Sequence, residues 1–290
     1  MATTVANLLT RLAYRLNEDS SPSDSNENAR RISFLSEAQR KVMGENYWWF
    51  SNGVASLPTV SGQEIYDLES DFRDMIEVRV DEKVCQPIPQ PDVYSNYDYP
   101  PLSYQYDGIL DRYWVFGENE FHLLPVPASA PSAVSVTITR SGTTATATAA
   151  HSLKVGNYVT IAGADQSDYN GVFRVTNTTT TTFNFTVENS PVTPATGTIT
   201  ATKRNVVYRY WKKHTDFSTS TDTTIIPDRY SDILIAFALS RKLTGAIEDE
   251  RGSMSDAIEE YNQILSDMKK ENNRKKFYFK QLIPKGSNVL

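Results

Sequence analysis

The side chains that most often catalyse reactions or bind metal ions are few in this chain and lie far apart. The three histidines, His122, His151 and His214, fall in strand, turn and loop contexts, and they form neither an HExxH motif nor a pair at helical spacing. The single cysteine, Cys85, has no histidine at a spacing known from thiol enzymes. We therefore predict structural roles for these residues, with no metal site, no catalytic site and no cofactor.

Longer catalytic motifs are also missing from the sequence. It contains no GxSxG elbow, no GxxxxGK[ST] phosphate loop and no GxGxxG dinucleotide fingerprint. Acidic residues gather at Asp67, Glu69, Asp71 and Asp74, but their spacing around two predicted strands is typical of solvated sheet edges. These observations favour a binding or structural protein over an enzyme. A hydrolase with an unrecognised carboxylate pair is the remaining enzymatic alternative.

Length and charge narrow the class of protein further. The chain has 290 residues, enough for two hydrophobic cores, and a formal net charge of −6. An acidic chain is not a nucleic-acid clamp, because a clamp needs an exposed basic face. The N-terminus lacks the features of a secretion signal, and no apolar run approaches the roughly 18 residues of a membrane span. We therefore expect a soluble protein without a membrane anchor.

Residues 132–203 form a threonine-rich block that interrupts a chain of ordinary composition. Such a contrast is typical of a module inserted into an exposed loop of another domain. We predict a discontinuous core domain of residues 1–131 and 204–273, an inserted β module of residues 132–203, and an extended C-terminal arm of residues 274–290. The block holds only seven charged residues, which are Arg140, Lys154, Asp165, Asp168, Arg174, Glu188 and Lys203.

The inserted block alternates apolar and polar residues as β-strands do. Short strands separated by Gly, Asn and Pro predict a small all-β barrel or sandwich. The run from His151 to Phe173 also resembles a small β module that recurs in tailed-phage structural proteins. The predicted strands are residues 134–139, 144–148, 158–161, 171–176, 182–187 and 197–201.

The core domain is predicted to combine helices with a small sheet, which gives an α+β fold. Apolar residues recur at helical spacing over residues 5–16, and again from about residue 27 to residue 43. Residues 228–273 carry two further apolar stripes and predict an antiparallel helical hairpin. Because the last predicted strand follows the block, the sheet should close across the insertion. Strands are predicted at residues 64–68, 75–80, 112–116, 120–124 and 206–211.

Two aromatic groups are candidates for contacts with other molecules. Four consecutive aromatics at residues 47–50 could stack on bases, but no basic residues interleave with them, so packing in the core or at a subunit interface is favoured. The loop of residues 87–108 is rich in tyrosine, a residue type enriched at interfaces. The candidate subunit or tail interface residues are Trp48, Trp49, Phe50, Tyr97, Tyr99 and Tyr104.

The C-terminal segment is basic and aromatic at once. From residue 269 onward, seven Lys or Arg residues face one acid, Glu271, and three adjacent aromatics are threaded through them. Two alternatives are open: contact with nucleic acid through charge and stacking, or an arm that orders when it docks into a partner protein. Docking is favoured because the apolar residues cluster as an anchor would. The candidate docking residues are Arg274, Lys275, Lys276, Phe277, Tyr278, Phe279, Lys280, Leu282 and Ile283.

The first part of the core domain resembles a known family. The run Asn-Ala-Arg-Arg-Ile at residues 28–32, the Trp-Trp-Phe element at residues 48–50 and the segment Val-Ala-Ser-Leu-Pro at residues 54–58 are similar to the head-to-tail adaptor proteins of tailed bacteriophages. Within that group they resemble the tail tubular protein A type of short-tailed phages. The similar stretch covers residues 24–80. The block of residues 132–203 and the tyrosine-rich loop depart from that pattern.

The resemblance implies a structural virion protein that forms a ring, usually of twelve subunits, between the portal and the tail. Double-stranded DNA would pass through the channel, a terminal arm would dock on the portal, and the opposite face would receive the tail nozzle or tubular protein. Assembly in the host cytoplasm and a place in the neck or tail of the virion follow. Glu248, Asp249 and Glu250, in the turn of the helical hairpin, are candidates for the channel wall. A negative net charge suits a channel through which DNA must slide.

The other function considered is that of a tail fibre or decoration protein. In that case the inserted β module would bind a receptor or a glycan, whereas in an adaptor it could meet tail fibres. Deleting residues 132–203 should separate the two, because only the fibre protein would lose its function. The resemblance further implies that the isolated adaptor can be a monomer that assembles on the portal.

Overall fold

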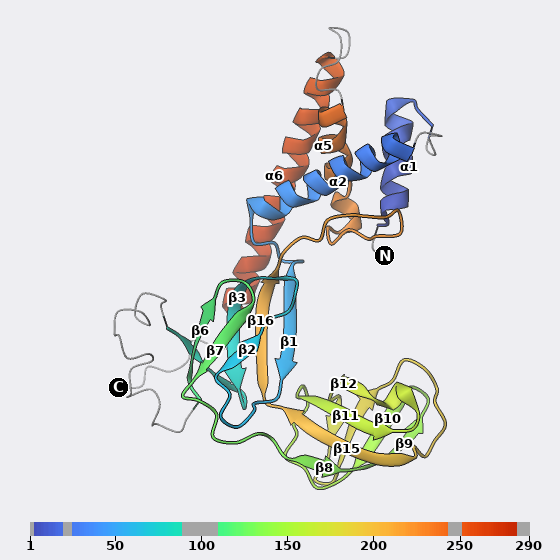
Figure 1. Cartoon of the computed structure of the whole chain (residues 1–290). Helices are drawn as coiled ribbons and strands as arrows, with labels where there is room; N and C mark the ends of the chain where they lie inside the picture. The colour runs from blue at the N-terminus through green and yellow to red at the C-terminus, as the bar shows by residue number, and fades with distance from the viewer. Residues whose placement is uncertain (1–2, 20–24, 89–109, 243–250, 283–290) are drawn as a thin grey trace. The chain divides into compact units, whose positions relative to one another are not determined.

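The chain has an α+β fold, seen in a computed structural model that describes residues 3–19, 25–88, 110–242 and 251–282 (Figure 1). It divides into two compact units. The helical unit comprises residues 1–52 and 211–290, and the β unit comprises residues 53–210. The interface candidates Tyr97, Tyr99 and Tyr104, the channel candidates Glu248, Asp249 and Glu250, and the arm residue Ile283 lie outside the described residues.

The helical unit is built around one helix whose central residues are all buried. Its helices are α1 (Val5–Leu16), α2 (Ser25–Glu45), α5 (Asp232–Lys242) and α6 (Arg251–Leu282), with a 3₁₀ turn, η2 (Asp228–Tyr230), before α5. Every residue of α5 from Ile233 to Leu239 is buried, and α5 packs against α1, α2 and α6. A helix that is apolar on all sides must be surrounded by others. The amphipathic helices α1 and α2 and the seam of α6 therefore supply its covering.

The ends of α1 are fixed by local hydrogen bonds. The side chain of Thr4 accepts a hydrogen bond from the amide of Asn7, which is the usual N-cap arrangement. At the other end Asn17 adopts the left-handed conformation, with φ 52°, and ends the helix. The predicted helix of residues 5–16 is thereby confirmed at both ends.

The β unit contains two four-stranded sheets outside residues 132–203. One has the order β1 (Asn52–Leu57), β16 (Val206–Lys212), β3 (Phe72–Val80) and β4 (Lys83–Val84). Figure 1 shows β16, which follows the block, lying beside β1, which precedes it, so the predicted closure across the block is confirmed. Gly53 allows this approach, because a Cβ atom there would lie 2.4 Å from the Tyr210 ring.

The second of these sheets contains the predicted hairpin. Its order is β2 (Ile65–Asp67), β7 (Glu120–Leu124), β6 (Arg112–Phe116) and β5 (Gln86–Pro87). Strands β6 and β7 pair antiparallel around the turn at Gly117, as predicted. Phe72 and Tyr208 of the first sheet and Phe121 of the second are buried in one shared core.

Residues 132–203 consist of strands and one 3₁₀ turn, η1 (Ser167–Tyr169). They form two four-stranded antiparallel sheets, in the orders β13-β14-β10-β9 and β12-β11-β15-β8, around one core that includes Tyr169, Phe183 and Phe185. The single strand predicted at residues 134–139 is instead two strands, β8 and β9. The role of this segment as an inserted barrel or sandwich stays a prediction. The strands are β8 (Ala133–Ser135), β9 (Thr137–Ser141), β10 (Thr144–Thr148), β11 (Tyr158–Ala164), β12 (Gly171–Arg174), β13 (Asn177–Thr178), β14 (Thr182–Thr186) and β15 (Gly197–Arg204).

The structure corrects one prediction about the C-terminus. An extended arm was predicted from Arg274 onward, but α6 continues as a helix to Leu282. The periodicity explains the difference. The apolar seam at residues 254, 258, 261, 265 and 268 is followed at the same four- and three-residue steps by Asn272, Lys275 and Phe279, so the helical period runs past residue 274.

Candidate partner-docking site

The predicted docking residues lie at the end of α6. Just before them, α6 is hydrogen-bonded to another segment of the helical unit. Asn272 of α6 has no exposed surface. Its Oδ1 accepts a hydrogen bond from the amide of Trp49 at 3.0 Å, and its Nδ2 donates one to the carbonyl of Tyr47 at 2.9 Å. A buried amide that satisfies two backbone groups fixes the register of α6 against the segment that follows α2.

The aromatic residues after α2 form the surface that receives α6. Trp48 is fully buried, and its indole Nε1 donates a hydrogen bond to the carbonyl of Val42 at 2.7 Å. Its ring stacks on Phe50, with centroids 5.9 Å apart, and Trp49 meets Phe50 edge to face at 4.9 Å. Trp48 therefore belongs to the core of its own subunit, which corrects its assignment to a subunit or tail interface. Trp49 and Phe50 are half-buried, and their interface role stays a prediction.

Charged side chains complete the contact between α6 and Trp49. The ammonium of Lys275 lies 4.7 Å from the centre of a Trp49 ring, a cation–π distance. Lys275 also pairs with Glu271 at 3.2 Å, one helical turn back. Glu271 in turn forms an ion pair with Arg229 and accepts a hydrogen bond from the hydroxyl of Tyr230 at 2.5 Å. One carboxylate thus links α6 to the segment that begins α5.

The charge of Glu271 is favoured by these partners. Burial raises the pKa of Glu271, but hydrogen bonds from Tyr230 and Lys275, and the charge of Arg229, outweigh burial and lower the pKa overall. Burial, together with the hydrogen bond to Glu271, raises the pKa of Tyr230. The carboxylate is therefore ionised and the phenol neutral near pH 7, so each group can make the contact described.

The predicted docking residues fall on this helix in two groups. Arg274 is exposed on α6, and Lys275 is partly exposed beside Trp49. Lys276, Phe277, Tyr278, Phe279, Lys280 and Leu282 lie in the last turns of α6. The anchoring residues Asn272, Glu271, Arg229 and Tyr230 were not predicted. The signal for Asn272 was present, because it occupies the next position of the apolar seam.

The arginine pair of the family-like run divides between surface and core. Arg30 is exposed, whereas Arg31 is buried. Within the helical unit, the guanidinium of Arg31 bonds to Glu18 at 2.6 Å, to Glu27 at 3.2 Å and to the carbonyl of Asp19 at 2.8 Å. This residue holds the end of α1 against α2 and is part of the scaffold.

The histidines and the cysteine lie apart in the structure. His122 stacks on Trp114 and contacts Glu64, Nδ1 of His151 accepts a hydrogen bond from the amide of Leu153, and His214 contacts Arg40. Burial raises the pKa of the Cys85 thiol to about 11. Within the described residues, no group of three or more His, Cys, Asp or Glu side chains is placed to hold a metal ion. Among the same residues, no helix combines the length and apolar character needed to cross a membrane.

Comparison with known families decides the class of the protein. The sequence model of the SU10 adaptor protein family matches residues 3–169, more than half of the chain. The chain belongs to this family. The match begins just before α1 and ends in η1, so it includes the N-terminal helices and the first half of the block of residues 132–203, and it does not reach α5 or α6.

Membership identifies this adaptor as a phage structural protein of the virion that links head and tail components, as the sequence predicted. The finer resemblance to the tail tubular protein A type is not confirmed. No curated protein matches the chain. A solved structure, the phage phi92 endosialidase, shares 23% identity over 28% of this chain and 13% of its own, with a TM-score of 0.20. That likeness is too small to bear on fold or function.

Proposed function

We propose that the adaptor forms a ring of twelve copies between the portal and the tail, and that the last turns of α6 dock on the portal. DNA passes through the channel of the ring without sequence-specific contacts, and the opposite face meets the tail nozzle or tubular protein. The anchoring of α6 at Asn272 and Trp49 is the observation that carries the docking half of this proposal.

The argument for docking starts from what the anchor does. A helix fixed at Asn272 projects its next turns from a defined point, so little orientational freedom is lost when they bind. Those turns contain Phe277, Tyr278 and Phe279, and aromatic side chains dominate the energetics of protein interfaces. The basic residues around them favour encounter with an acidic partner surface. A helix laid into a groove is therefore the expected binding mode.

The ring half of the proposal rests on family membership and on charge. Closed cyclic assemblies are common among homo-oligomers, and an adaptor between two coaxial components requires one. The chain carries a net charge of −6, and a ring of such subunits repels phosphates rather than binding them. DNA can then pass without being held.

The experiment compares the full chain with a chain that ends at Lys275. This truncation keeps Asn272, Glu271 and Lys275, so the contacts with Trp49 persist and the helical unit should melt close to the temperature of the full chain. We expect that purified portal, imaged by electron microscopy, acquires a collar with the full chain and none with the truncated chain.

Two further variants separate aromatic docking from charge. Replacement of Phe277, Tyr278 and Phe279 by Ala should abolish the collar, whereas Lys276→Gln with Lys280→Gln should weaken it in low salt only. A collar that forms normally with the truncated chain would show that α6 does not dock on the portal. Loss of the collar with the lysine variant but not with the alanine variant would favour charge, and not aromatic contact, as the basis of docking.

A further inference from the structure

The turn between β3 and β4 has an unusual backbone. It consists of Asp81 and Glu82, with φ values of 46° and 73°, so both residues are in the left-handed region. Two-residue hairpin turns of this kind favour Asn-Gly, because residues with a Cβ atom are strained there. Asp is tolerated at the first position, but Glu at the second is a costly choice. Strain of this kind persists only where surrounding contacts hold it.

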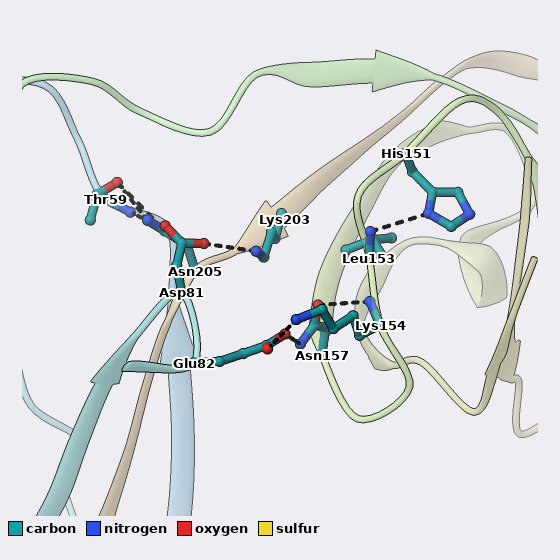
Figure 2. A network of polar contacts seen from close by, with 9 residues as sticks. All are labelled: Thr59, Asp81, Glu82, His151, Leu153, Lys154, Asn157, Lys203 and Asn205. Carbon is teal, nitrogen blue, oxygen red and sulfur yellow. Dashed lines mark hydrogen bonds and ion pairs between the residues drawn. The ribbon is translucent and has the colours of Figure 1, made fainter. Parts of the chain in front are cut away.

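Both side chains of this turn reach residues of the block 132–203. The carboxylate of Asp81 pairs with Nζ of Lys203 at 2.7 Å. The carboxylate of Glu82 accepts a hydrogen bond from Nζ of Lys154 at 2.6 Å and another from Nδ2 of Asn157 at 3.3 Å. Figure 2 shows these contacts converging on the turn from β15 and from the loop before β11.

The loop of residues 154–157, which contacts Glu82, is held in shape by its own hydrogen bonds. The side chain of Asn157 accepts a hydrogen bond from the amide of Lys154 at 2.9 Å, and its backbone amide donates one to the carbonyl of Lys154 at 3.0 Å. Gly156 between them has a φ of 92°, which closes the turn. Lys154 and Asn157 are thus presented together, and Glu82 engages both.

Further hydrogen bonds lie near residues 204 and 205, where the chain leaves the block beside the Asp81–Glu82 turn. The amide of Asp81 donates to the carbonyl of Asn205 at 2.9 Å. The buried side chain of Asn205 accepts from the amide of Thr59 at 2.8 Å, as Figure 2 shows. Arg204 bonds to Ser56 of β1 and, at 3.1 Å, to Thr160 of β11, so one guanidinium touches both the block and the β1-β16-β3-β4 sheet. This sheet and the β2-β7-β6-β5 sheet are the host sheets.

A cavity lies at this junction. It has a volume of about 440 Å³, lies beside the contacts and is lined by Asp81 and Lys203 together with Leu153 and Phe183 of the block. Across this space the two sides make no dispersion contact, so the cavity itself does not define an orientation. The contacts that join the turn to the block are polar.

We propose that the Asp81–Glu82 turn is an ionic clasp that sets the orientation of residues 132–203 relative to the host sheets. The strained turn aims two carboxylates at two lysines, and opening the clasp leaves the hydrogen bonds of Arg204 to Ser56 and Thr160 where the chain leaves the block. Exposed ion pairs are individually weak and are screened by salt. The clasp is therefore reversible, and the module can reorient when a partner or high salt competes for these charges. This inference goes beyond the proposed function and does not depend on it.

The test replaces the turn by the sequence that the backbone prefers. Asp81→Asn with Glu82→Gly relieves the strain and removes both carboxylates, so the hairpin keeps its fold while the clasp is lost. Spin labels are attached to Asn119→Cys on the host sheet and Thr179→Cys on the module, in a Cys85→Ala background. Electron spin resonance then gives the distribution of distances between them. We expect the fraction of molecules outside the main distance peak to rise roughly fivefold.

Matched variants make the result decisive. Lys154→Gln with Lys203→Gln should broaden the distribution in the same way, as should about 1 M salt on the unaltered turn. Asp256→Asn with Glu259→Gln removes two carboxylates from α6 and should leave the distribution narrow. Glu82→Lys alone should broaden the distance distribution. Adding Lys154→Glu restores the ion pair with exchanged charges and should narrow the distribution again. An unchanged narrow distribution in the Asn-Gly variant, with its melting temperature retained, would overturn the proposal.

Discussion

At the scale of single residues, Arg31 shows how a charged side chain becomes part of a core. Its side chain is 2% exposed, and its guanidinium is satisfied by two carboxylates and a backbone carbonyl. Lys242 of α5 contacts the same Glu18 and Glu27, so four charges join α1, α2 and α5. A buried charge is tolerable only when such a network is complete.

We predict that Arg31→Met lowers the free energy of unfolding by about 2–4 kcal/mol, because it leaves the two carboxylates without their buried guanidinium partner. Arg31→Lys should recover only part of this loss, since an ammonium lacks the planar fork. The neighbouring exposed Arg30→Lys should change stability by less than about 0.5 kcal/mol. Urea unfolding followed by circular dichroism measures all three. Equal effects at residues 30 and 31 would contradict the burial argument.

The same cluster predicts a dependence on pH. Hydrogen bonding to Lys242, and then to Arg31, lowers the pKa of Glu27 below its ordinary value of 4.5. A carboxylate with a lowered pKa stabilises the fold above the unfolded pKa, and this contribution is lost as the pH falls through the folded pKa. The melting temperature should therefore fall below about pH 4.5, and less steeply in Glu27→Gln. Parallel curves for the two proteins between pH 5 and pH 3 would refute this assignment.

At the scale of elements, α6 depends on one amide for its position. Asn272 bonds to Trp49 and Tyr47, which are more than two hundred residues away along the chain. Around this point Lys275 and Glu271 add contacts that reach Trp49 and η2. The docking turns of α6 are therefore fixed by the segment after α2 and not by the helix alone.

We predict that Asn272→Ala lowers the free energy of unfolding by about 2–3 kcal/mol, because the amide of Trp49 and the carbonyl of Tyr47 lose their hydrogen bonds to a fully buried side chain. Hydrogen exchange in the last turns of α6 should become faster, and attachment to the portal should weaken. Asn273→Ala, at an exposed position of the same helix, serves as the control and should change neither quantity. Hydrogen exchange with mass spectrometry, and the portal collar experiment, give the readouts. Fast exchange confined to α1 would contradict the proposed anchor.

At the scale of the whole molecule, the hydrophobic residues form separate cores. One core lies among the helices, one joins the host sheets, and one lies within residues 132–203. Since no strand of the block pairs with a strand of the host sheets, the described host core does not require the block. Polar contacts at the junction connect the block to the host sheets.

We predict that a chain lacking residues 132–203, closed by a short Gly-Ser linker, still folds and still forms a collar on the portal. Arg204 and Asn205 are kept, so their contacts with Ser56 and Thr59 remain. Leu234→Ala in the buried helix α5 is the contrasting variant, expected to cost about 2–5 kcal/mol. Loss of the collar on deletion would instead favour the fibre or decoration alternative, in which the module supplies the function.

The sequence by itself determined the α+β class, the segment of distinct composition, most strands and helices, and the phage adaptor class. The α+β class, the distinct segment and the elements follow from local pattern, because the period of apolar residues reports which face of an element is buried. The adaptor class follows from the resemblance carried by residues 28–32, 48–50 and 54–58. Tertiary structure decided that Arg31 is buried while Arg30 is exposed, that Trp48 belongs to the core, and that Asn272 fixes α6. It also decided that Asp81 and Glu82 face Lys203 and Lys154. Polar partners of this kind are chosen by contacts between residues far apart in the chain, and no local pattern encodes them.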